Sequence, residues 1–209
     1  MISETRDIES SDESPEAVAE EYCRFVDRVY GMFLDATFAM GNMASWYMDS
    51  NRGHWKELEQ TGQELKYDDF NPEVVYSGSV RGDPGDLHRS RLHDVIARNV
   101  PSGGNWHFLA LMCVVGIYSA WEDHFRARIA AGLGLQKKDL KADVFGEVGA
   151  LRHSIVHRRG FASDKVAKAK LTKAFPEDEP IKLEPEDLHE VALLMQDGAR
   201  MLSRLSSAA

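Results

Sequence analysis

The stretch SPEAVAEEYCRFVDRVYGMFLDATFAMGNMASW, residues 14–46, decides the fold class of this 209-residue chain. Ser14 is a preferred N-cap residue, Pro15 suits the first helical position, and Glu16 complements the positive end of a helix dipole. Beyond them, apolar side chains recur every seven residues, with a second set at the offset position. The two sets are Val18, Phe25, Met32, Ala39 and Trp46, and Tyr22, Val29, Ala36 and Met43. The pattern predicts one helix to about residue 49, whose apolar seam packs in a bundle or a dimer.

Helical periodicity continues along most of the remaining chain. Further helices are predicted over 54–66, 105–131 and 139–159, and from Pro185 onward. Residues 71–104 carry many glycine and proline turn signals, and they are expected to form an irregular insertion with a short helix over 87–98. No strand pair, glycine-rich phosphate loop or internal repeat is recognisable. The expected fold is therefore all-α, an up-and-down helical bundle over residues 14–206, preceded by a disordered acidic tail, residues 1–13.

The composition is that of a globular protein, with 43% hydrophobic and 28% charged residues. The two cysteines, Cys23 and Cys113, exclude a disulfide scaffold and a multi-cysteine zinc site, and they indicate a reducing, cytoplasmic setting. The acidic N-terminus lacks the apolar core of a secretory signal. The most apolar run, residues 106–121, is shorter than the roughly 20 residues of a membrane span, so we expect a buried helix and no membrane partner.

The formal net charge of −9 is unevenly distributed. Residues 1–23 contain eight acidic residues and one basic residue, whereas residues 126–173 contain twelve basic and four acidic residues. A locally basic segment can bind a polyanion even in an acidic protein, because affinity depends on the local cluster. The alternative interpretation is that these lysines and arginines lie on solvated helix faces.

The candidate catalytic residues lie in LRHSIVHRRG, residues 151–160, near the end of the helix predicted over 139–159. At 100° per residue, His153 and His157 lie one turn apart on one face, and Arg152 lies on the same broad polar side. Gly160 suits the left-handed position that follows a helix end. The last turn therefore presents two imidazoles and a guanidinium.

These residues resemble the signature of the HEPN superfamily, all-helical domains found in ribonucleases of toxin–antitoxin, abortive-infection and CRISPR systems. That signature is an arginine, a polar residue, three further residues and a histidine, which are matched here by Arg152, His153 and His157. The preceding YSAWE, residues 118–122, also resembles standalone HEPN proteins of bacterial defence islands, and the resemblance covers about residues 105–206. In HEPN toxins modified by a nucleotidyltransferase, a tyrosine stands two residues after the histidine. Arg159 at that position argues against such regulation.

The resemblance implies a metal-independent endoribonuclease of toxin or antiphage-defence type that uses no cofactor. His157 would be the acid/base group for a ribose 2′-hydroxyl, and Arg152 would stabilise charge on the phosphate. His153 would orient Arg152 or hold a phosphate. Members of the family dimerise with two motifs facing each other, so we expect RNA as substrate and a homodimer. An antitoxin or another defence-system protein is a further expected partner.

Several residues are predicted to support this site. Glu122 is either a partner of Arg152 or the i+4 partner of Arg126. The residues expected to contact RNA are Arg158, Arg159, Lys165 and Lys168.

Alternative interpretations remain open for the motif. Arg152 suits a surface ion pair with Glu122 or Asp187, and His157 suits a capping role. His153 and His157 also have the i, i+4 spacing of helical zinc ligands, but no third ligand is evident in the sequence. The last alternative is a catalytically silent helical domain that binds RNA or a protein.

Overall fold

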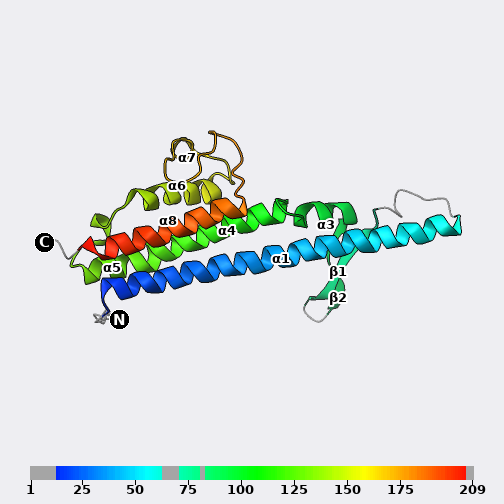
Figure 1. Cartoon of the computed structure of the whole chain (residues 1–209), viewed down its shortest axis with the longest axis horizontal. Coiled ribbons are helices and arrows are strands. Elements are labelled where there is room, and N and C mark those ends of the chain that lie inside the picture. Colours follow the sequence, from blue (N-terminus) through cyan, green and yellow to red (C-terminus); the bar gives the residue numbers. More distant parts are fainter. Residues whose placement is uncertain (1–12, 63–70, 81–82, 206–209) are drawn as a thin grey trace. The chain divides into compact units, whose positions relative to one another are not determined.

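The computed structural model describes residues 13–62, 71–80 and 83–205 (Figure 1). The elements are α1 (Pro15–Thr61), β1 (Glu73–Val80), β2 (Asp83–Arg91), α3 (Leu92–Asn99), α4 (Gly104–Ala120), the π-helical turn η1 (Trp121–Phe125), α5 (Arg126–Gly132), the 3-10 turn η2 (Lys137–Asp139), α6 (Asp143–His157), α7 (Asp164–Ala167) and α8 (Pro185–Ser203). Helices dominate and the strands form one two-stranded sheet, so the all-α prediction is confirmed. Of the acidic tail predicted over residues 1–13, only Glu13 lies among the described residues.

The described chain divides into two compact units. Unit 1 contains the residues up to Val29, Val114–Ile181, and the residues from His189 onward, and unit 2 contains Tyr30–Cys113 and Lys182–Leu188. The helix that carries the HEPN-like motif, α6, belongs to unit 1.

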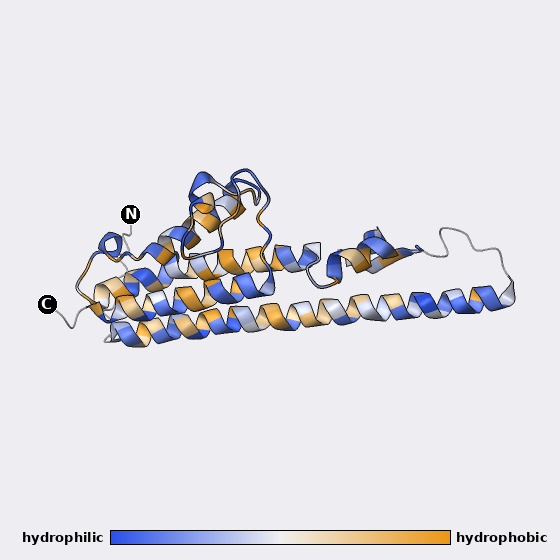
Figure 2. Ribbon diagram, turned by 45° about the horizontal axis from the view of Figure 1, so that its top comes forward, coloured by the Kyte–Doolittle hydropathy of each residue, from blue (hydrophilic) through white to orange (hydrophobic). Residues whose placement is uncertain are grey.

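α1 is longer than predicted. The Ser14 hydroxyl accepts a hydrogen bond from the backbone N–H of Ala17 at 3.2 Å, which confirms the N-cap. The helix continues through Asn51 and Gly53 to Thr61, so the break predicted near residue 49 and the separate helix from residue 54 are wrong. A glycine inside a helix costs only about 1 kcal/mol relative to alanine, and the good helix formers that follow outweigh it. Figure 2 shows that this last part of α1 is mainly hydrophilic.

The seven-residue seam predicted for α1 holds only at its beginning. Val18 and Tyr22 are buried, but the side chains of Met32 and Trp46 are 55% and 63% exposed. A straight α-helix drifts by about 20° per heptad from a strict seven-residue repeat, which amounts to about 80° over four heptads. The buried face therefore moves to other positions farther along the helix. These are Val26, Phe33, Thr37 and Ala44.

Aromatic rings form the centre of unit 1. The indole of Trp121 is stacked on the ring of Phe145, with centroids 3.8 Å apart and an interplanar angle of 7°. Tyr22 of α1 packs against Trp121 at 5.5 Å and against Phe125 at 5.1 Å. The Tyr22 hydroxyl donates a hydrogen bond to the carbonyl oxygen of Ile117 at 3.2 Å, which satisfies its polar end inside the core. These contacts join α1, η1 and α6.

The helices predicted over 105–131 and 139–159 and from Pro185 are present. The first is divided into α4, η1 and α5, and it buries Ala110, Val114, Ile117 and Trp121. It is not buried all round as predicted, because Phe108 is 62% exposed. α6 buries the predicted apolar stripe at Val144, Val148, Leu151 and Ile155. α8 buries Leu188, Val191, Met195 and Leu202.

Residues 71–104 are not mainly irregular, and the prediction of no strand pair is wrong. β1 and β2 are antiparallel, with Val75 opposite Arg89. Within unit 2, α3 follows β2 directly. It begins at Leu92, five residues after the start of the helix predicted over 87–98. Glycine, proline and aspartate at the start of β2 indicate a turn and hide the pairing, whereas the β-branched and aromatic run Val74–Tyr76 is the local signal for a strand.

Within the described residues, no single helix is long and apolar enough to span a membrane. The bent pair Leu92–Asn99 and Gly104–Gly132 meets the requirements of length and composition only when both parts are taken together.

The stacked indole predicts a large stability effect. Replacing Trp121, which is 1% exposed, by alanine removes the ring against Phe145 and leaves a cavity. We expect Trp121→Ala to lower the free energy of unfolding by about 3–5 kcal/mol, measured by urea denaturation. Trp46→Ala is the matched control, because this tryptophan is 63% exposed, and it should change stability by no more than about 0.5 kcal/mol. Equal losses in the two variants would contradict the assignment of the core.

Candidate functional site

The last turn of α6 holds the motif residues, and the chain turns sharply after it. The carbonyl oxygen of Ser154 accepts hydrogen bonds from the backbone N–H groups of Arg158, at 3.1 Å, and Gly160, at 3.2 Å. Gly160 has a φ of 82°, which confirms the predicted left-handed position, and Arg159 before it has a φ of 58°. This turn ends the helix at His157 and leaves the imidazole exposed.

Arg152, His153 and His157 meet on the surface of unit 1. The Nη1 atom of Arg152 lies 3.4 Å from Nε2 of His157, at the long end of the hydrogen-bonding range. The rings of His153 and His157 have centroids 4.8 Å apart and an interplanar angle of 41°. The predicted cluster of one guanidinium and two imidazoles is therefore present, because the long arginine side chain spans the distance around the helix.

The guanidinium of Arg152 is only partly engaged. Its Nε atom is buried and has no hydrogen-bond partner. Among the described residues, Arg152 forms no ion pair with a carboxylate, so the surface ion pair that the sequence left open is not formed. A half-buried guanidinium without a carboxylate keeps its positive charge available to an anion.

Glu122 is the partner of residues other than Arg152. Its Oε2 accepts a hydrogen bond from Nη1 of Arg126 at 2.7 Å, and its Oε1 lies 3.0 Å from Nζ of Lys137. Burial by itself raises the pKa of the Glu122 carboxyl, but these hydrogen bonds outweigh burial and hold the pKa below its usual value. Of the two partners predicted for Glu122, the i+4 partner is the one found.

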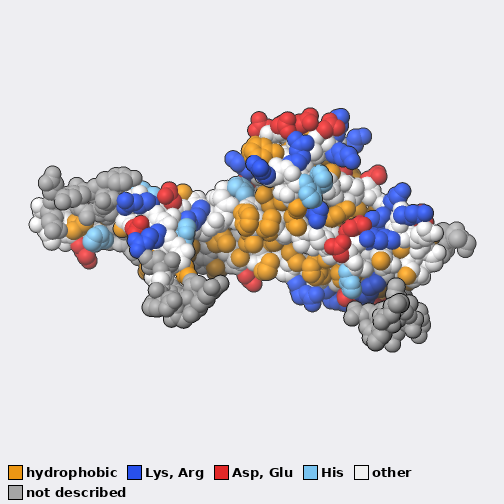
Figure 3. All heavy atoms as spheres, turned by 180° about the vertical axis from the view of Figure 1, so that it is seen from behind, with side chains coloured by type: hydrophobic (Ala, Val, Ile, Leu, Met, Phe, Trp, Pro, Cys, Tyr) orange, Lys and Arg blue, Asp and Glu red, His pale blue; other side chains and the backbone are white. Residues whose placement is uncertain are grey.

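The four residues predicted to contact RNA differ in how their charges are used. Arg158 forms a short ion pair with Asp178, and Nζ of Lys168 lies 2.7 Å from Asp164. Arg159 and Lys165 are exposed and form no ion pair with any described residue. Figure 3 shows lysine, arginine and histidine side chains on the projecting part of unit 1 that carries α7, with a row of aspartate and glutamate side chains along its outer edge.

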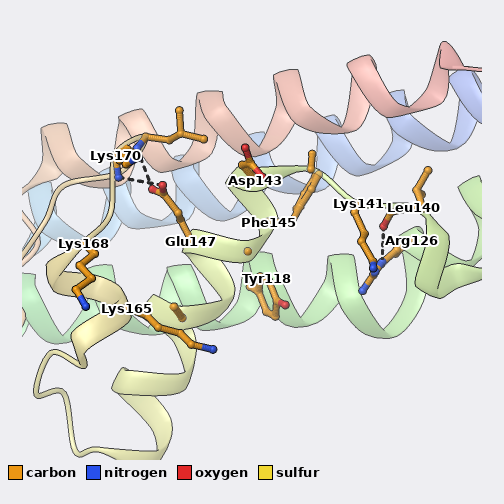
Figure 4. A pocket seen from close by; sticks show the side chains of 14 residues that line it. Tyr118, Arg126, Leu140, Lys141, Asp143, Phe145, Glu147, Lys165, Lys168 and Lys170 are labelled. Carbon is orange, nitrogen blue, oxygen red and sulfur yellow. Dashed lines mark hydrogen bonds between the residues drawn. The ribbon is translucent and has the colours of Figure 1, made fainter.

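Two adjoining hollows lie along α6, and we call them together the α6 groove. One has a volume of about 680 Å³ and the other of about 540 Å³. Tyr118, Gly146, Ala150 and Lys165 line both. The larger hollow also contains Arg126, Lys141, Asp143, Glu147, Lys168 and Lys170, and the smaller one contains Gly149, His153, Arg158 and Asp164. Figure 4 shows Arg126 and Lys141 at one end of the larger hollow, Lys165 and Lys168 at the other, and Tyr118 between them.

The sequence interpretation did not include Lys141 and Lys170 among the functional residues. They come from segments far apart in the chain, and each taken alone is an ordinary exposed lysine. Lys141 and Lys170 both lie in the basic segment 126–173, and the charge of that segment was the feature of the sequence that could have indicated them. Only the packing of the segment after α7 against α6 brings them to one groove.

The carboxylate of Glu147 holds the wall of the α6 groove together. It accepts hydrogen bonds from the backbone N–H groups of Lys170, Leu171 and Thr172, each at 2.9 Å. Burial by itself raises the pKa of the Glu147 carboxyl, but the backbone hydrogen bonds outweigh burial and hold the pKa below its usual value. Glu147 therefore fixes the segment 170–172 against α6, and its ionised carboxylate stays part of the lining of the larger hollow.

Other reactive groups in the described part of the chain do not form a metal site. No cluster of three or more histidine, cysteine, aspartate or glutamate side chains that could hold a metal ion occurs there. Burial raises the pKa of both cysteine thiols, Cys23 and Cys113, to about 11. Both thiols therefore stay protonated and unreactive near neutral pH.

A scan against protein-family models found no match, and searches of curated proteins and of solved structures found no similar chain.

The Glu147 contacts predict a stability that depends on pH. A lowered folded-state pKa means that the ionised carboxylate stabilises the fold above the unfolded-state value, and that this stabilisation is lost as the pH falls through the folded-state pKa. We expect Glu147→Gln to reduce the free energy of unfolding by about 1–2 kcal/mol at pH 7. The difference from the parent protein should shrink below the usual glutamate pKa of about 4.3.

Glu190→Gln is the control, because Glu190 is exposed on α8. Urea unfolding followed at several pH values measures both variants. A difference between Glu147→Gln and the parent that is constant with pH would contradict this interpretation.

Proposed function

We propose that this protein is a metal-independent endoribonuclease whose reacting groups are Arg152 and His157, as the resemblance to the HEPN superfamily implies. The observation that supports it best is the 3.4 Å approach of the Arg152 guanidinium to the His157 imidazole at an exposed helix end. A positive group that binds phosphate and a group that exchanges protons are thereby side by side.

In this proposal, the unprotonated ring nitrogen of His157 removes a proton from a ribose 2′-hydroxyl. The 2′-oxygen then attacks the adjacent phosphorus, and the bond to the 5′-oxygen breaks. The leaving oxygen takes a proton, so the products are a 2′,3′-cyclic phosphate and a 5′-hydroxyl.

Arg152 stabilises the negative charge that develops on the non-bridging phosphate oxygens. Its planar guanidinium can donate parallel hydrogen bonds to these oxygens through its Nη groups. His153 stacks near His157 and supplies a further donor for a phosphate. Arg152 and His153 can act on the phosphate in this way without a metal ion as a Lewis acid.

The acid that protonates the leaving oxygen comes, in this proposal, from a second copy of the chain. Two imidazoles with centroids 4.8 Å apart on one helix would approach a phosphate from the same side. In-line displacement instead requires the base and the acid on opposite sides. Val156 and Phe161, both 45% exposed, place apolar surface beside the site where a second copy would pack.

Substitution of the two reacting groups tests the proposal. We expect His157→Ala to reduce the rate of RNA cleavage by about 10²- to 10⁴-fold. Arg152→Ala should also lose cleavage, and Arg152→Lys should not fully restore it because lysine lacks the planar fork. The measurement is the cleavage of labelled RNA in vitro with analysis of the product ends, with and without a chelator.

The matched control is His54→Ala, which removes an exposed histidine of unit 2. It should cleave as the parent does, and all variants should keep the parent's melting temperature within a few degrees. Normal cleavage by His157→Ala, or activity abolished by chelator and restored by magnesium, would contradict the proposal. RNA binding without any cleavage by the parent would instead identify a silent binding domain.

The two-copy arrangement predicts a dimer in solution. Sedimentation at micromolar concentration should give twice the mass of the 23.5 kDa chain. Val156→Asp places a charge on the apolar surface beside the site and should shift the protein toward the monomer with loss of cleavage. Leu87→Asp, at a position of β2 that is 57% exposed, should remain dimeric. A fully active monomer would exclude a histidine from a second copy.

A further inference from the structure

The part of α6 where the two hollows adjoin carries little side-chain bulk. Gly146, Gly149 and Ala150 follow one another at helical spacing there, and His153 lies one turn farther along. A Cβ at Gly149 would lie 2.6 Å from the Tyr118 hydroxyl oxygen, so the glycine is what lets the phenol lie against the helix. A Cβ at Gly146 would meet no atom within 4 Å, so the space above it is open.

The charges that border this space are unequally compensated. Arg126 is bound by Glu122, and Lys168 is bound by Asp164. The Glu147 carboxylate is occupied by three backbone N–H groups. The ammonium groups of Lys141, Lys165 and Lys170 form no ion pair with any residue the structure describes. The carboxylates of Asp143 and Glu177 also line the hollows and form none, so the groove keeps an excess of positive charge.

Tyr118 lies between these cations and contributes an aromatic ring to both hollows. Burial raises the pKa of its hydroxyl, and the Glu122 carboxylate raises it further. The phenol is therefore protonated at neutral pH and keeps an uncharged ring and a hydrogen-bond donor. An aromatic ring set between positive groups is the arrangement that proteins use to bind single-stranded nucleic acid.

The α6 groove leads to the reacting groups. Its smaller hollow is bordered by His153, whose ring lies 4.8 Å from the ring of His157. A strand that lies along α6 therefore passes from the lysines over Tyr118 to the imidazoles.

We propose that the α6 groove holds the single RNA strand next to the scissile phosphate, with its phosphates on Lys141, Lys165 and Lys170 and one base on the Tyr118 ring. This inference rests on the proposed function, because it names the substrate form that the same site accepts. The volume of about 680 Å³ lies in the range that encloses a ligand of nucleotide size. In a duplex the bases are stacked inside the helix and cannot reach the ring, so the geometry selects unpaired RNA.

A binding experiment tests the groove separately from catalysis. The full-length chain with His157→Ala, which blocks cleavage, is titrated into fluorescent single-stranded RNA, and anisotropy is recorded at several salt concentrations. We expect Lys141→Ala, Lys165→Ala and Lys170→Ala together to weaken binding by at least about tenfold and to reduce the salt slope by about 2, at about 0.7 per lost phosphate contact. Tyr118→Leu should weaken binding by about tenfold, and Tyr118→Phe, which keeps the ring, should bind as its background does.

The matched control removes the same number of charges elsewhere. Arg28, Lys56 and Lys182 are exposed and lie outside the groove, and their joint replacement by alanine should leave binding close to that of the background. Equal losses in both triple variants, equal binding of duplex and single strand, or no RNA binding by the background would overturn the inference.

The two proposals fail differently. If the parent cleaves RNA through His157 but the groove variants bind RNA normally, the groove is not the path of the strand and the ribonuclease function stands. If the groove variants lose binding as expected but the parent never cleaves, the groove binds RNA and the ribonuclease function fails.

Discussion

The stacking of Trp121 on Phe145 is the contact on which the position of the candidate site depends. Its ring centroids are 3.8 Å apart, and the pair joins η1 to the first turn of α6 inside the core of unit 1. Every group assigned to binding or chemistry either lies on α6 or faces it. The position of α6 is therefore the position of the site, and a stack of two buried aromatic rings is well suited to fix it because of its area and its preferred geometry.

α6 combines two opposite demands along one helix. Its apolar stripe, which includes Val148 and Leu151, is buried and secures the helix. Its other side carries glycine and alanine where the groove runs, and arginine and histidine where the helix ends. The buried stripe holds α6 in place, and the small side chains of Gly146, Gly149 and Ala150 leave room for the groove. The three backbone hydrogen bonds to Glu147 then hold the opposite wall of the groove in place.

Local charge, and not total charge, decides what the groove accepts. The chain as a whole is acidic, with a net charge of −9, yet basic side chains outnumber acidic ones around the groove, and Glu122 and Asp164 are paired with neighbouring cations. Arg158 is neutralised by Asp178, and Lys141 and Lys165 are not neutralised. At physiological ionic strength, charges beyond about 8 Å are screened, so an anion in the groove interacts mainly with the lysines beside it.

The sequence by itself determined the features that depend on neighbouring residues along the chain. The helix cap at Ser14, the apolar stripe of α6 and the left-handed turn at Gly160 follow from spacing and backbone preference, and so does the pairing of His153 with His157 one turn apart. Tertiary structure decided the rest, because those features depend on contacts between distant segments. The hold of Glu147 on residues 170–172 and the placing of Lys141 and Lys170 along one groove were settled by packing. Local spacing specifies which side chains share a face, but only the packed chain specifies what that face meets.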